Sequence, residues 1–146
     1  MQLSNEEGRA LLAKQGKKKG NQESVMQSQF VAWFRLKYPQ YAKLLTAIPN
    51  GGKRDIITAS ILKREGVTAG WPDILMAVPR NGFFGLFMEM KVEAGKVSAK
   101  QEEMIHLLIE QGYQAVVVWS FEEAQWTVLN YLQEESKNAT KNTFIL

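Results

Sequence analysis

Three charged residues stand inside otherwise apolar sequence in the stretch GWPDILMAVPRNGFFGLFMEMK, which runs from Gly70 to Lys91. Asp73 opens the first apolar run, and Glu89 and Lys91 lie two positions apart near the end of the second. Burying a charge costs several kcal/mol unless the charge is paired or binds something. The three residues are therefore candidates for an ion-binding or catalytic cluster, if the fold brings them together.

The elements that must bring these charges together form a β-hairpin. We predict strands over residues 73–79 and 83–92, joined through the Asn-Gly pair at 81–82, which is a strong signal for a tight hairpin turn. The returning chain places Asp73 opposite the end of the second strand. Because side chains alternate across a strand, the glutamate and the lysine point to the same face. All three charges can then converge at one edge of the sheet.

Two carboxylates at one edge repel each other, which favours a bound cation between them. The carbonyl of Met90 adds another oxygen, and carboxylate, carbonyl and water oxygens are the ligands of Mg²⁺ and Mn²⁺. Beside such an ion, Lys91 could orient or help to deprotonate an attacking water and neutralise charge on a phosphate. The competing interpretation is a surface salt bridge from Lys91 to Glu89 or Asp73, because this pattern recurs by chance in many chains.

Hydrophobic periodicity and capping signals predict the other elements. The predicted order is a helix at 23–37, a strand at 43–49, a helix at 54–66, the hairpin, a helix at 98–112, a strand at 113–119 and a helix at 120–133. The last two helices each begin with a capping box, Ser98 with Gln101 and Ser120 with Glu123. The first helix has one apolar face, made by Met26, Phe30, Trp33 and Phe34. This order describes an α/β fold with a mixed central sheet flanked by helices.

The length and composition limit the class of protein. A chain of 146 residues can bury one core and leaves no room for a second domain. It has no cysteine and a single histidine, His106, which excludes disulfides, thiolate metal sites, cysteine nucleophiles and zinc sites with two or more histidines. No apolar run approaches the roughly 18 residues of a membrane span, and the N-terminus lacks the layout of a secretory signal. We expect a cytoplasmic protein with no membrane partner.

The net charge of +3 is concentrated at the N-terminus. Residues 1–22 hold five Lys or Arg residues against two Glu, whereas residues 23–146 hold 13 of each sign. We therefore divide the chain into a basic arm at 1–22, a balanced domain at 23–135 and a C-terminal tail at 136–146. The arm contains Lys14, Lys17, Lys18 and Lys19. It could contact phosphates, and the alternative is a solubilising, disordered end.

The stretch GWPDILMAV…MEMKVEAGKVSAKQ resembles the PD-(D/E)xK nuclease superfamily, with Pro72-Asp73 and Glu89-Met90-Lys91 as the core of the motif. More narrowly, the chain is similar to the VRR-NUC (virus-type replication-repair nuclease) family. The supporting motifs are IPNGGKR at 48–54, GVTAGWPD at 66–73, and Ser98 with Gln101. The resemblance covers roughly residues 23–120 and implies a restriction-endonuclease-like αβββαβ core in this domain.

The resemblance implies a role for each matching residue. Asp73, Glu89 and the Met90 carbonyl would hold Mg²⁺ or Mn²⁺, Lys91 would serve the attacking water, and Gln101 would support the site from the third helix. Such nucleases often carry a further acid on the first helix, and Glu23 is the candidate here. The alternatives are that Glu23 only interacts favourably with a helix N-terminus and that Gln101 only caps its helix.

Candidate DNA contacts flank these residues. They are Asn50, Gly51, Gly52, Lys53, Arg54, Ser98 and Lys100, with backbone facing the DNA at the glycines and basic side chains contacting phosphates. The alternative for residues 50–52 is a tight turn without function. His106 is not expected to be catalytic, and the aromatic residues are expected mainly in the core or an interface. Trp71, beside the Pro-Asp pair, is left open.

By resemblance, the protein would hydrolyse DNA phosphodiester bonds and leave 5′-phosphate and 3′-hydroxyl ends. Small stand-alone domains of this kind resemble phage or bacterial proteins that act on branched DNA, such as flaps or four-way (Holliday) junctions in DNA repair, in a bacterial or phage-infected cell. Junction resolution needs two active sites and hence a homodimer, through the first helix and the apolar C-terminal segment. Two alternatives stay open: a non-catalytic DNA-binding or recombination accessory protein on the same fold, and a sequence-specific restriction-type endonuclease.

Overall fold

A computed structural model describes residues 5–49, 55–93 and 95–133, with side chains from residue 21 onward. Its elements follow the predicted order, with one short 3₁₀ helix added. They are α1 (Asn5–Lys37), the 3₁₀ helix η1 (Pro39–Leu44), β1 (Leu45–Ala47), α2 (Ile56–Arg64), β2 (Ile74–Met76), β3 (Leu86–Met90), α3 (Ala99–Glu110), β4 (Gln114–Val118) and α4 (Phe121–Tyr131). In this part of the chain no helix is long and apolar enough to cross a membrane.

The sheet has the order β1-β2-β3-β4. Its first two pairings are antiparallel and the third, between β3 and β4, is parallel, so the predicted mixed sheet is confirmed. The strands are shorter than predicted. Residues 43–44 belong to η1, which begins at Pro39, where proline favours the first turn of a helix. Regular pairing in the hairpin ends at Met76 and resumes at Leu86.

The predicted hairpin turn is present at residues 80–83. Arg80 and Phe83 form a bridge across it, and Asn81 and Gly82 have φ angles of 51° and 81°. Positive φ at both central positions is the requirement of a tight hairpin turn that Asn-Gly meets at low cost. The Asn81 side chain also donates a hydrogen bond to the Tyr131 carbonyl at 3.0 Å, which ties the turn to α4.

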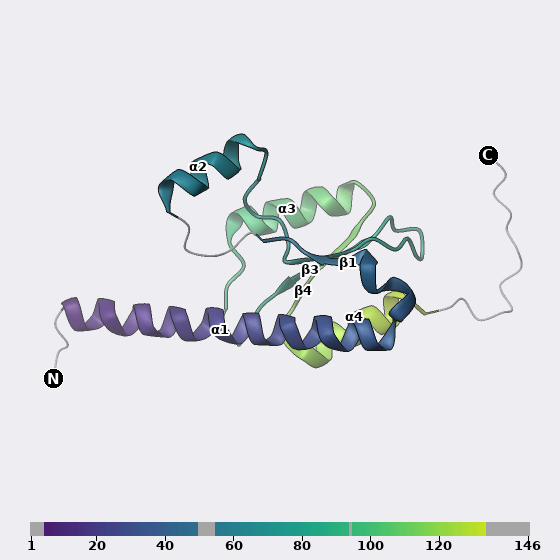
Figure 1. Cartoon of the computed structure of the whole chain (residues 1–146), viewed down its shortest axis with the longest axis horizontal. Helices are drawn as coiled ribbons and strands as arrows, with labels where there is room; N and C mark the ends of the chain where they lie inside the picture. The colour runs from purple at the N-terminus through teal and green to yellow at the C-terminus, as the bar shows by residue number, and fades with distance from the viewer. Residues whose placement is uncertain (1–4, 50–54, 94, 134–146) are drawn as a thin grey trace, which may run out of the picture.

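Helices cover both faces of the sheet (Figure 1). Helices α1 and α4 lie together on one face and bury the main core, in which Phe30 and Phe34 of α1 are fully buried. Met26 is also buried and Trp33 is partly buried, so the predicted apolar face of this helix is confirmed. Helix α3 lies on the other face, over a smaller core that includes Phe87 and Leu108.

Strand β3 is buried along its whole length, and alternation sorts its side chains between the two cores. Leu86, Met88 and Met90 belong to the α1–α4 core, whereas Phe87 belongs to the α3 core. Glu89 therefore points to the face that α3 covers. This arrangement places a carboxylate under the start of α3, where a polar partner can reach it.

Helix α1 begins at Asn5, which is 18 residues earlier than the predicted start at Glu23. The added segment is rich in Ala, Leu, Glu, Lys and Gln, which are strong helix formers, and this propensity accounts for the longer helix. The boundary drawn at residue 22 falls inside α1, so residues 5–22 are not a disordered end. The predicted tail at 136–146 lies outside the described residues.

Helix α2 differs from the other α-helices because none of its residues is buried. Its isoleucines are exposed, with Ile56 at 88% and Ile57 at 74%. The Asp55 side chain caps the helix by accepting bonds from the Thr58 amide at 2.9 Å and the Thr58 hydroxyl at 2.7 Å. In Figure 1, α2 and the N-terminal part of α1 both extend beyond the sheet on the left of the view.

The two predicted capping boxes have different outcomes. At α3 the box is complete, with reciprocal bonds between Ser98 and Gln101. At α4 the Ser120 hydroxyl accepts from the Glu123 amide at 3.1 Å, but the Glu123 carboxylate accepts from Trp119 at 2.8 Å. The second box is therefore corrected: its glutamate binds the amide one residue before the cap, because that amide also needs a partner.

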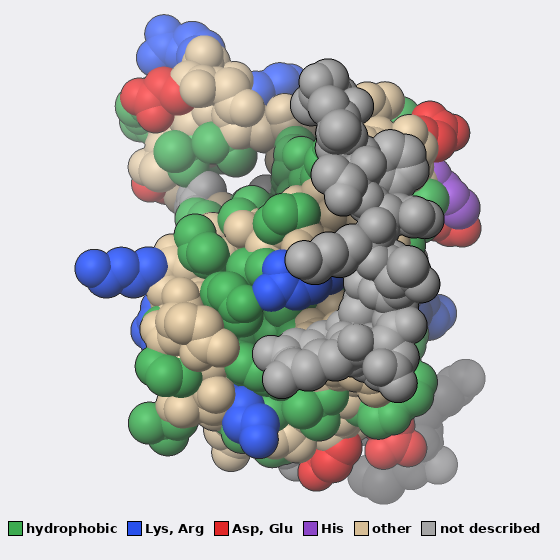
Figure 2. Space-filling view, turned by 90° about the vertical axis from the view of Figure 1, so that its right-hand side faces the viewer, with side chains coloured by type: hydrophobic (Ala, Val, Ile, Leu, Met, Phe, Trp, Pro, Cys, Tyr) green, Lys and Arg blue, Asp and Glu red, His purple; other side chains and the backbone are tan. Residues whose placement is uncertain are grey.

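The end of the molecule near the hairpin turn carries exposed hydrophobic side chains. Figure 2 looks at this end and shows hydrophobic side chains across much of the face, with basic side chains among them. Phe83 and Phe84, which follow the turn, are 37% and 65% exposed. Arg80 donates a 2.6 Å bond to the Tyr41 hydroxyl and lies 5.5 Å from the centre of that ring. The charged cluster lies at the opposite end of the hairpin.

Candidate active site

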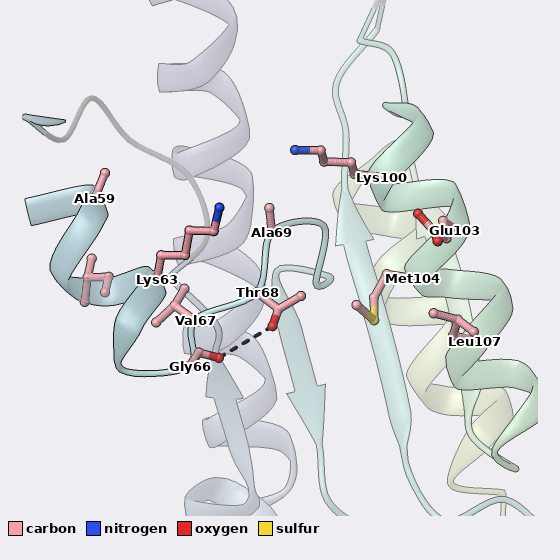
Figure 3. Close-up of a pocket in the computed structure, with 11 residues that line it drawn as sticks. Ala59, Lys63, Gly66, Val67, Thr68, Ala69, Lys100, Glu103, Met104 and Leu107 are labelled. Carbon is pink, nitrogen blue, oxygen red and sulfur yellow. Dashed lines mark hydrogen bonds between the residues drawn. The ribbon is translucent and has the colours of Figure 1, made fainter.

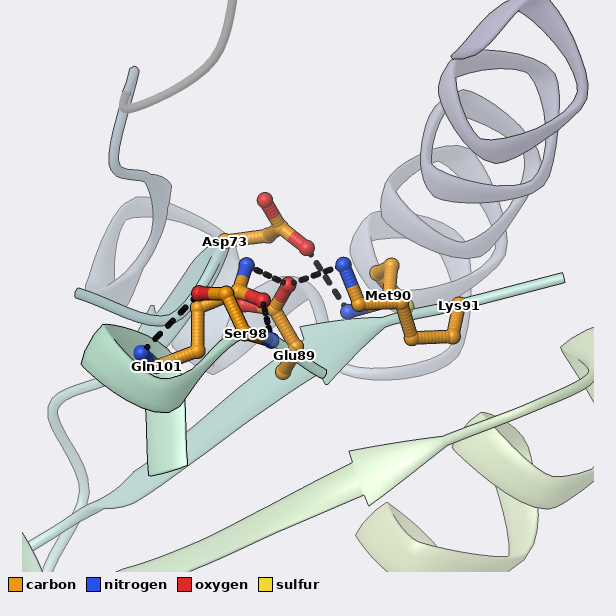
Figure 4. Close-up of polar contacts among 6 residues, drawn as sticks. All are labelled: Asp73, Glu89, Met90, Lys91, Ser98 and Gln101. Atoms are coloured by element: carbon orange, nitrogen blue, oxygen red, sulfur yellow. Dashed lines mark hydrogen bonds and ion pairs between the residues drawn. The ribbon is translucent and has the colours of Figure 1, made fainter. Parts of the chain in front are cut away.

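The antiparallel pairing of β2 with β3 places Asp73 and Glu89 across from each other. Ile74 pairs with Met88, so the next pair outward joins Asp73 to Glu89. The Asp73 carboxylate folds over the end of β3 and accepts a 2.7 Å hydrogen bond from the Met90 amide (Figure 4). The hairpin therefore brings the two acids to one end of the sheet, as the sequence predicted.

Glu89 is almost completely buried, with 1% of its surface exposed. One carboxylate oxygen, Oε1, carries both of its contacts: an ion pair with Lys91 Nζ at 2.9 Å and a short hydrogen bond from the Gln101 side-chain amide. The other oxygen, Oε2, is buried and has no hydrogen-bond partner among the described residues. A buried carboxylate oxygen without a partner is costly, so this atom points to a ligand that completes the site.

Lys91 is fixed at both ends. Its backbone amide donates to the Val118 carbonyl at 2.9 Å, and its ammonium group meets Glu89. The side chains of the pair are only 11% and 2% exposed, so the salt bridge of the competing interpretation is present with Glu89 but is buried and not at the surface. A buried ion pair does not ordinarily stabilise a fold relative to apolar residues of the same size. Its presence here favours a chemical role over a purely structural one.

Gln101 is held between the helix cap and the glutamate. Its side-chain oxygen accepts from the Ser98 amide at 2.9 Å, and its backbone amide donates to the Ser98 hydroxyl at 3.3 Å. With the oxygen occupied in this way, the amide nitrogen faces Glu89 (Figure 4). The capping function and the contact with the site are therefore compatible. Ser98 acts on the site through Gln101, and its own side chain is occupied by the cap.

The electrostatics of the site raise the pKa values of both carboxyl groups. Burial and, to a lesser degree, repulsion from Asp73 raise the pKa of Glu89 from 4.5 to about 7, although Lys91 opposes the shift. Burial also raises the pKa of Asp73, against the lowering effects of the Met90 amide and Lys91. Two neighbouring acids with raised pKa values are typical of functional sites.

Glu23 of α1 lies near the cluster formed by Asp73, Glu89 and Lys91. It adds repulsion that raises the pKa values of both Asp73 and Glu89. Gly95 lies beside Glu23 Oε1 and Lys91 Cδ, each 3.4 Å from the position of a Cβ on this glycine, but it is the Val92 carbonyl oxygen, 2.9 Å from that position, that requires glycine here. Within the described ranges no three acidic or histidine side chains form a metal-binding group. Glu23 therefore borders the cluster without joining Asp73 and Glu89 in a three-acid set.

The donor set fits a hard divalent cation. Asp73 and the free Glu89 Oε2 supply carboxylate oxygens. The Met90 amide bonds to Asp73, and the N–H and C=O of one strand residue point to the same side, so the Met90 carbonyl also faces Asp73. Carboxylate and carbonyl oxygens are the ligands that Mg²⁺ and Mn²⁺ prefer.

The other predicted residues are placed as follows. Lys100 is exposed, and its backbone lies against Gly70, where a Cβ would come within 2.5 Å of the Lys100 carbonyl oxygen. Gly70 also has a φ of 96°, so this position needs glycine for two reasons. The role of Gly70 could not be predicted, because a close approach between distant segments leaves no local pattern in the sequence. The predicted DNA contacts at 50–54 lie outside the described residues.

The structure also places Trp71 and His106. Trp71 is half-buried and packs edge-on against Phe87, with ring centres 5.6 Å apart, so it belongs to the α3 core. His106 is exposed on α3 and takes part in none of the contacts of the cluster that the structure records. Neither observation adds a residue to the site.

Comparisons with known proteins agree with the fold. The VRR-NUC domain family matches residues 4–122, which is most of the chain. A solved structure described as a VRR_NUC domain protein is similar in fold, with a TM-score of 0.66 and 24% sequence identity over 75% of this chain and 87% of that chain. No curated protein matches the sequence at a significant level. The family match covers the hairpin, its acids and Lys91, and the chain therefore belongs to the VRR-NUC family of nucleases.

Proposed function

We propose that this protein is a metal-dependent endonuclease that hydrolyses phosphodiester bonds in DNA. The observation that carries the proposal is the buried Glu89 Oε2, which has no partner among the described residues while two donors occupy Oε1. Asp73, Glu89 and the Met90 carbonyl would hold Mg²⁺ or Mn²⁺. A cation bound there would stabilise charge on the phosphate and lower the pKa of a water molecule.

The residues around this position divide the remaining work. Lys91 Nζ is held 2.9 Å from the glutamate, which keeps its ammonium group beside the place where a phosphate oxygen or attacking water would lie. Gln101 holds Glu89 in one rotamer, and Asp73 is oriented by the Met90 amide. Glu23 adds negative charge at the border, which favours a bound cation. The scaffold is rigid because every residue of β3 is buried.

The proposed substrate is branched DNA, such as a flap or a four-way junction. This part rests on the likeness to small stand-alone nuclease domains, whose products would carry 5′-phosphate and 3′-hydroxyl ends. Cleaving both strands of a junction requires two sites, so we propose a homodimer. The packed α1–α4 layer supports it, because Leu36 is 84% exposed and Trp126 is 67% exposed.

Cleavage assays with the wild type and Lys91→Ala test the activity. Labelled linear, flap and four-way-junction DNA would be incubated with Mg²⁺, Mn²⁺ or EDTA. We expect nicking of branched DNA that disappears in EDTA and falls by about a thousandfold or more in the variant, the range for losing a group that stabilises the transition state. Lys43→Ala, an exposed lysine on η1, is the matched control. Equal cleavage by Lys91→Ala would remove this lysine from the mechanism.

Light scattering tests the dimer separately, with the protein alone and with junction DNA. A single monomer mass under both conditions would contradict it. The accessory-protein alternative predicts tight junction binding with no cleavage in any metal. Against that alternative stands the intact set of Asp73, Glu89 and Lys91, which a binding module does not need.

A further inference from the structure

A second feature of the surface is a groove of about 840 Å³ between α2 and α3 (Figure 3). Its floor is the loop that joins α2 to β2, and its walls are the two helices. The lining residues are Ala59, Leu62, Lys63, Gly66, Val67, Thr68, Ala69, Lys100, Glu103, Met104 and Leu107. Nothing in the proposed chemistry uses this space.

The lining combines an apolar surface with positive charge. Lys63 projects from the α2 wall and Lys100 from the α3 wall, and both ammonium groups reach over the floor loop from opposite sides (Figure 3). The lining contains one acid, Glu103, so its net charge is positive. Leu62, Val67 and Met104 provide the apolar contacts. This composition suits a polyanion with flat apolar groups, which describes a nucleic-acid strand with unpaired bases.

The groove lies next to the candidate active site. Lys100 of its lining immediately precedes Gln101, whose side chain donates to Glu89. Ala69 of its floor is followed by Gly70, which packs directly against the Lys100 backbone, and Asp73 follows three residues later. A strand lying in the groove would therefore pass close to the carboxylates.

The volume of the groove favours single-stranded over double-stranded nucleic acid. A space of about 840 Å³ lies near the upper end of sites that hold a single small ligand, about 300 to 1,000 Å³. It can admit a few unpaired nucleotides but not a duplex. Within the described residues α2 has no buried side chain, so its packing leaves the width of the groove free to adjust.

We propose that this groove binds a single-stranded segment of DNA next to the point of cleavage, with Lys63 and Lys100 contacting its phosphates and the apolar lining contacting its bases. The inference rests on the proposed nuclease function and narrows its substrate to DNA with an unpaired arm beside the duplex. Charge complementarity and proximity to the site favour this occupant over a second copy of the chain.

The test compares binding of two fluorescent probes in EDTA, where no cleavage occurs: a duplex, and the same duplex with an oligothymidine tail. We expect the wild type to bind the tailed probe more tightly. Lys63→Glu should reduce this preference by about three- to tenfold and lower the salt slope for the tailed probe by about 0.7, the value for one single-strand phosphate contact. Arg64→Glu, the same charge change on the neighbouring residue outside the lining, should keep the preference.

A second variant, Ala59→Phe, fills the groove without changing charge, and Ala59 is exposed, so the fold tolerates it. We expect it to reduce the tail preference as well. An equal effect of Lys63→Glu and Arg64→Glu, or an unchanged preference in Ala59→Phe, would overturn the inference. A dimer that dissociates in Ala59→Phe would also overturn it, because the groove would then hold a second copy.

The outcomes separate this inference from the proposed function. If the wild type shows a Lys63-dependent tail preference but cleaves nothing in Mg²⁺ or Mn²⁺, the groove stands and the nuclease proposal fails. If the wild type cleaves DNA while the tail preference is absent, the nuclease proposal stands and the groove inference fails.

Discussion

Strand β3 and helix α2 lie at opposite extremes of burial. Every residue of β3 is buried, including Glu89, whereas no residue of α2 is buried. The strand holds the charged groups in single conformations, at the cost of desolvating them. The helix holds its conformation through its Asp55 cap and its own backbone bonds. The comparison shows that the residues of the candidate active site lie in the most constrained part of the molecule. One wall of the groove between α2 and α3 is formed by the least constrained part.

This contrast predicts different local stabilities. An isolated helix of nine residues is marginal in water, because nucleation is costly and few bonds repay it. Segments with few buried apolar contacts open locally at low free energy, whereas core strands open only on global unfolding. Four tests by substitution examine this comparison, from the largest expected effect to the smallest.

The largest effect concerns Glu89→Gln. The pKa of Glu89 is raised from 4.5 to about 7, so the folded protein holds this proton more tightly than the unfolded chain does. That contribution to stability is full below pH 4.5 and is lost as the pH rises through about 7. In EDTA at pH 8, the variant should be more stable than the wild type by about 3 kcal/mol, and the gain should vanish near pH 4.5.

Urea unfolding at both pH values measures this gain, with Glu102→Gln as the control because that acid is exposed on α3. If the difference in the free energy of unfolding between variant and wild type stays constant across the pH range, the pKa of Glu89 is not raised by folding.

The next effect concerns Gln101→Ala. Loss of the donor on Oε1 should raise the pKa of Glu89 further and free its side chain, so cleavage should fall by about 10- to 100-fold, as for other residues that orient metal ligands. The acidic limb of the pH–rate profile should move to higher pH. Ser120→Ala is the matched control, since it weakens the cap of α4 away from the site. An unshifted profile would assign Gln101 to the cap alone.

A smaller effect is expected from removing the helix caps of α3 and α2, the two helices that flank the groove. Ser98→Ala should lower the free energy of unfolding by about 1 kcal/mol, because α3 is packed on the sheet and its cap is part of the folded core. Asp55→Ala should leave the unfolding midpoint unchanged and speed amide exchange within α2. The Thr58 bonds lower the pKa of Asp55, so the wild-type cap should weaken only when the pH falls through that lowered value. Equal midpoint shifts for both variants would contradict the contrast.

The smallest effect compares two isoleucines. Ile74 in β2 is fully buried and Ile57 in α2 is 74% exposed. Ile74→Val should lower stability by about 1 kcal/mol, the usual range for deleting one buried methylene, whereas Ile57→Val should cost nothing measurable. Thermal unfolding of the two variants measures the difference. A clear loss for Ile57→Val in the isolated protein would indicate that a partner or a second copy covers α2.

The sequence predicted the parts of the structure that depend on local signals. The Asn-Gly turn fixed the hairpin, and the hairpin brought Asp73 to Glu89 and Lys91. The Ser98 capping box also formed as expected, because both of its bonds join residues three positions apart. These features need no knowledge of distant contacts.

Features that depend on tertiary contacts escaped prediction. Gly70 is needed where segments far apart in the sequence come together, and Lys63 became a candidate ligand contact only once α2 and α3 were placed. Glu123 bound Trp119 because two amides compete for one carboxylate. The early start of α1 was missed because residues 5–22 lack a clear apolar face, although their helix propensity is high.

Because α1 is continuous, it fixes the spacing between Glu23 and the residues of the basic N-terminal segment. Lys19 and Lys14 precede Glu23 by four and nine residues, which corresponds to about 6 Å and about 14 Å along the helix axis. The helical backbone therefore sets how far these two positions lie from Glu23. Deleting residues 1–20 would leave a frayed helix end only three residues from Glu23 and so disturb the site as well. Replacing Lys17 and Lys18 with Gln removes charge while keeping the helix intact.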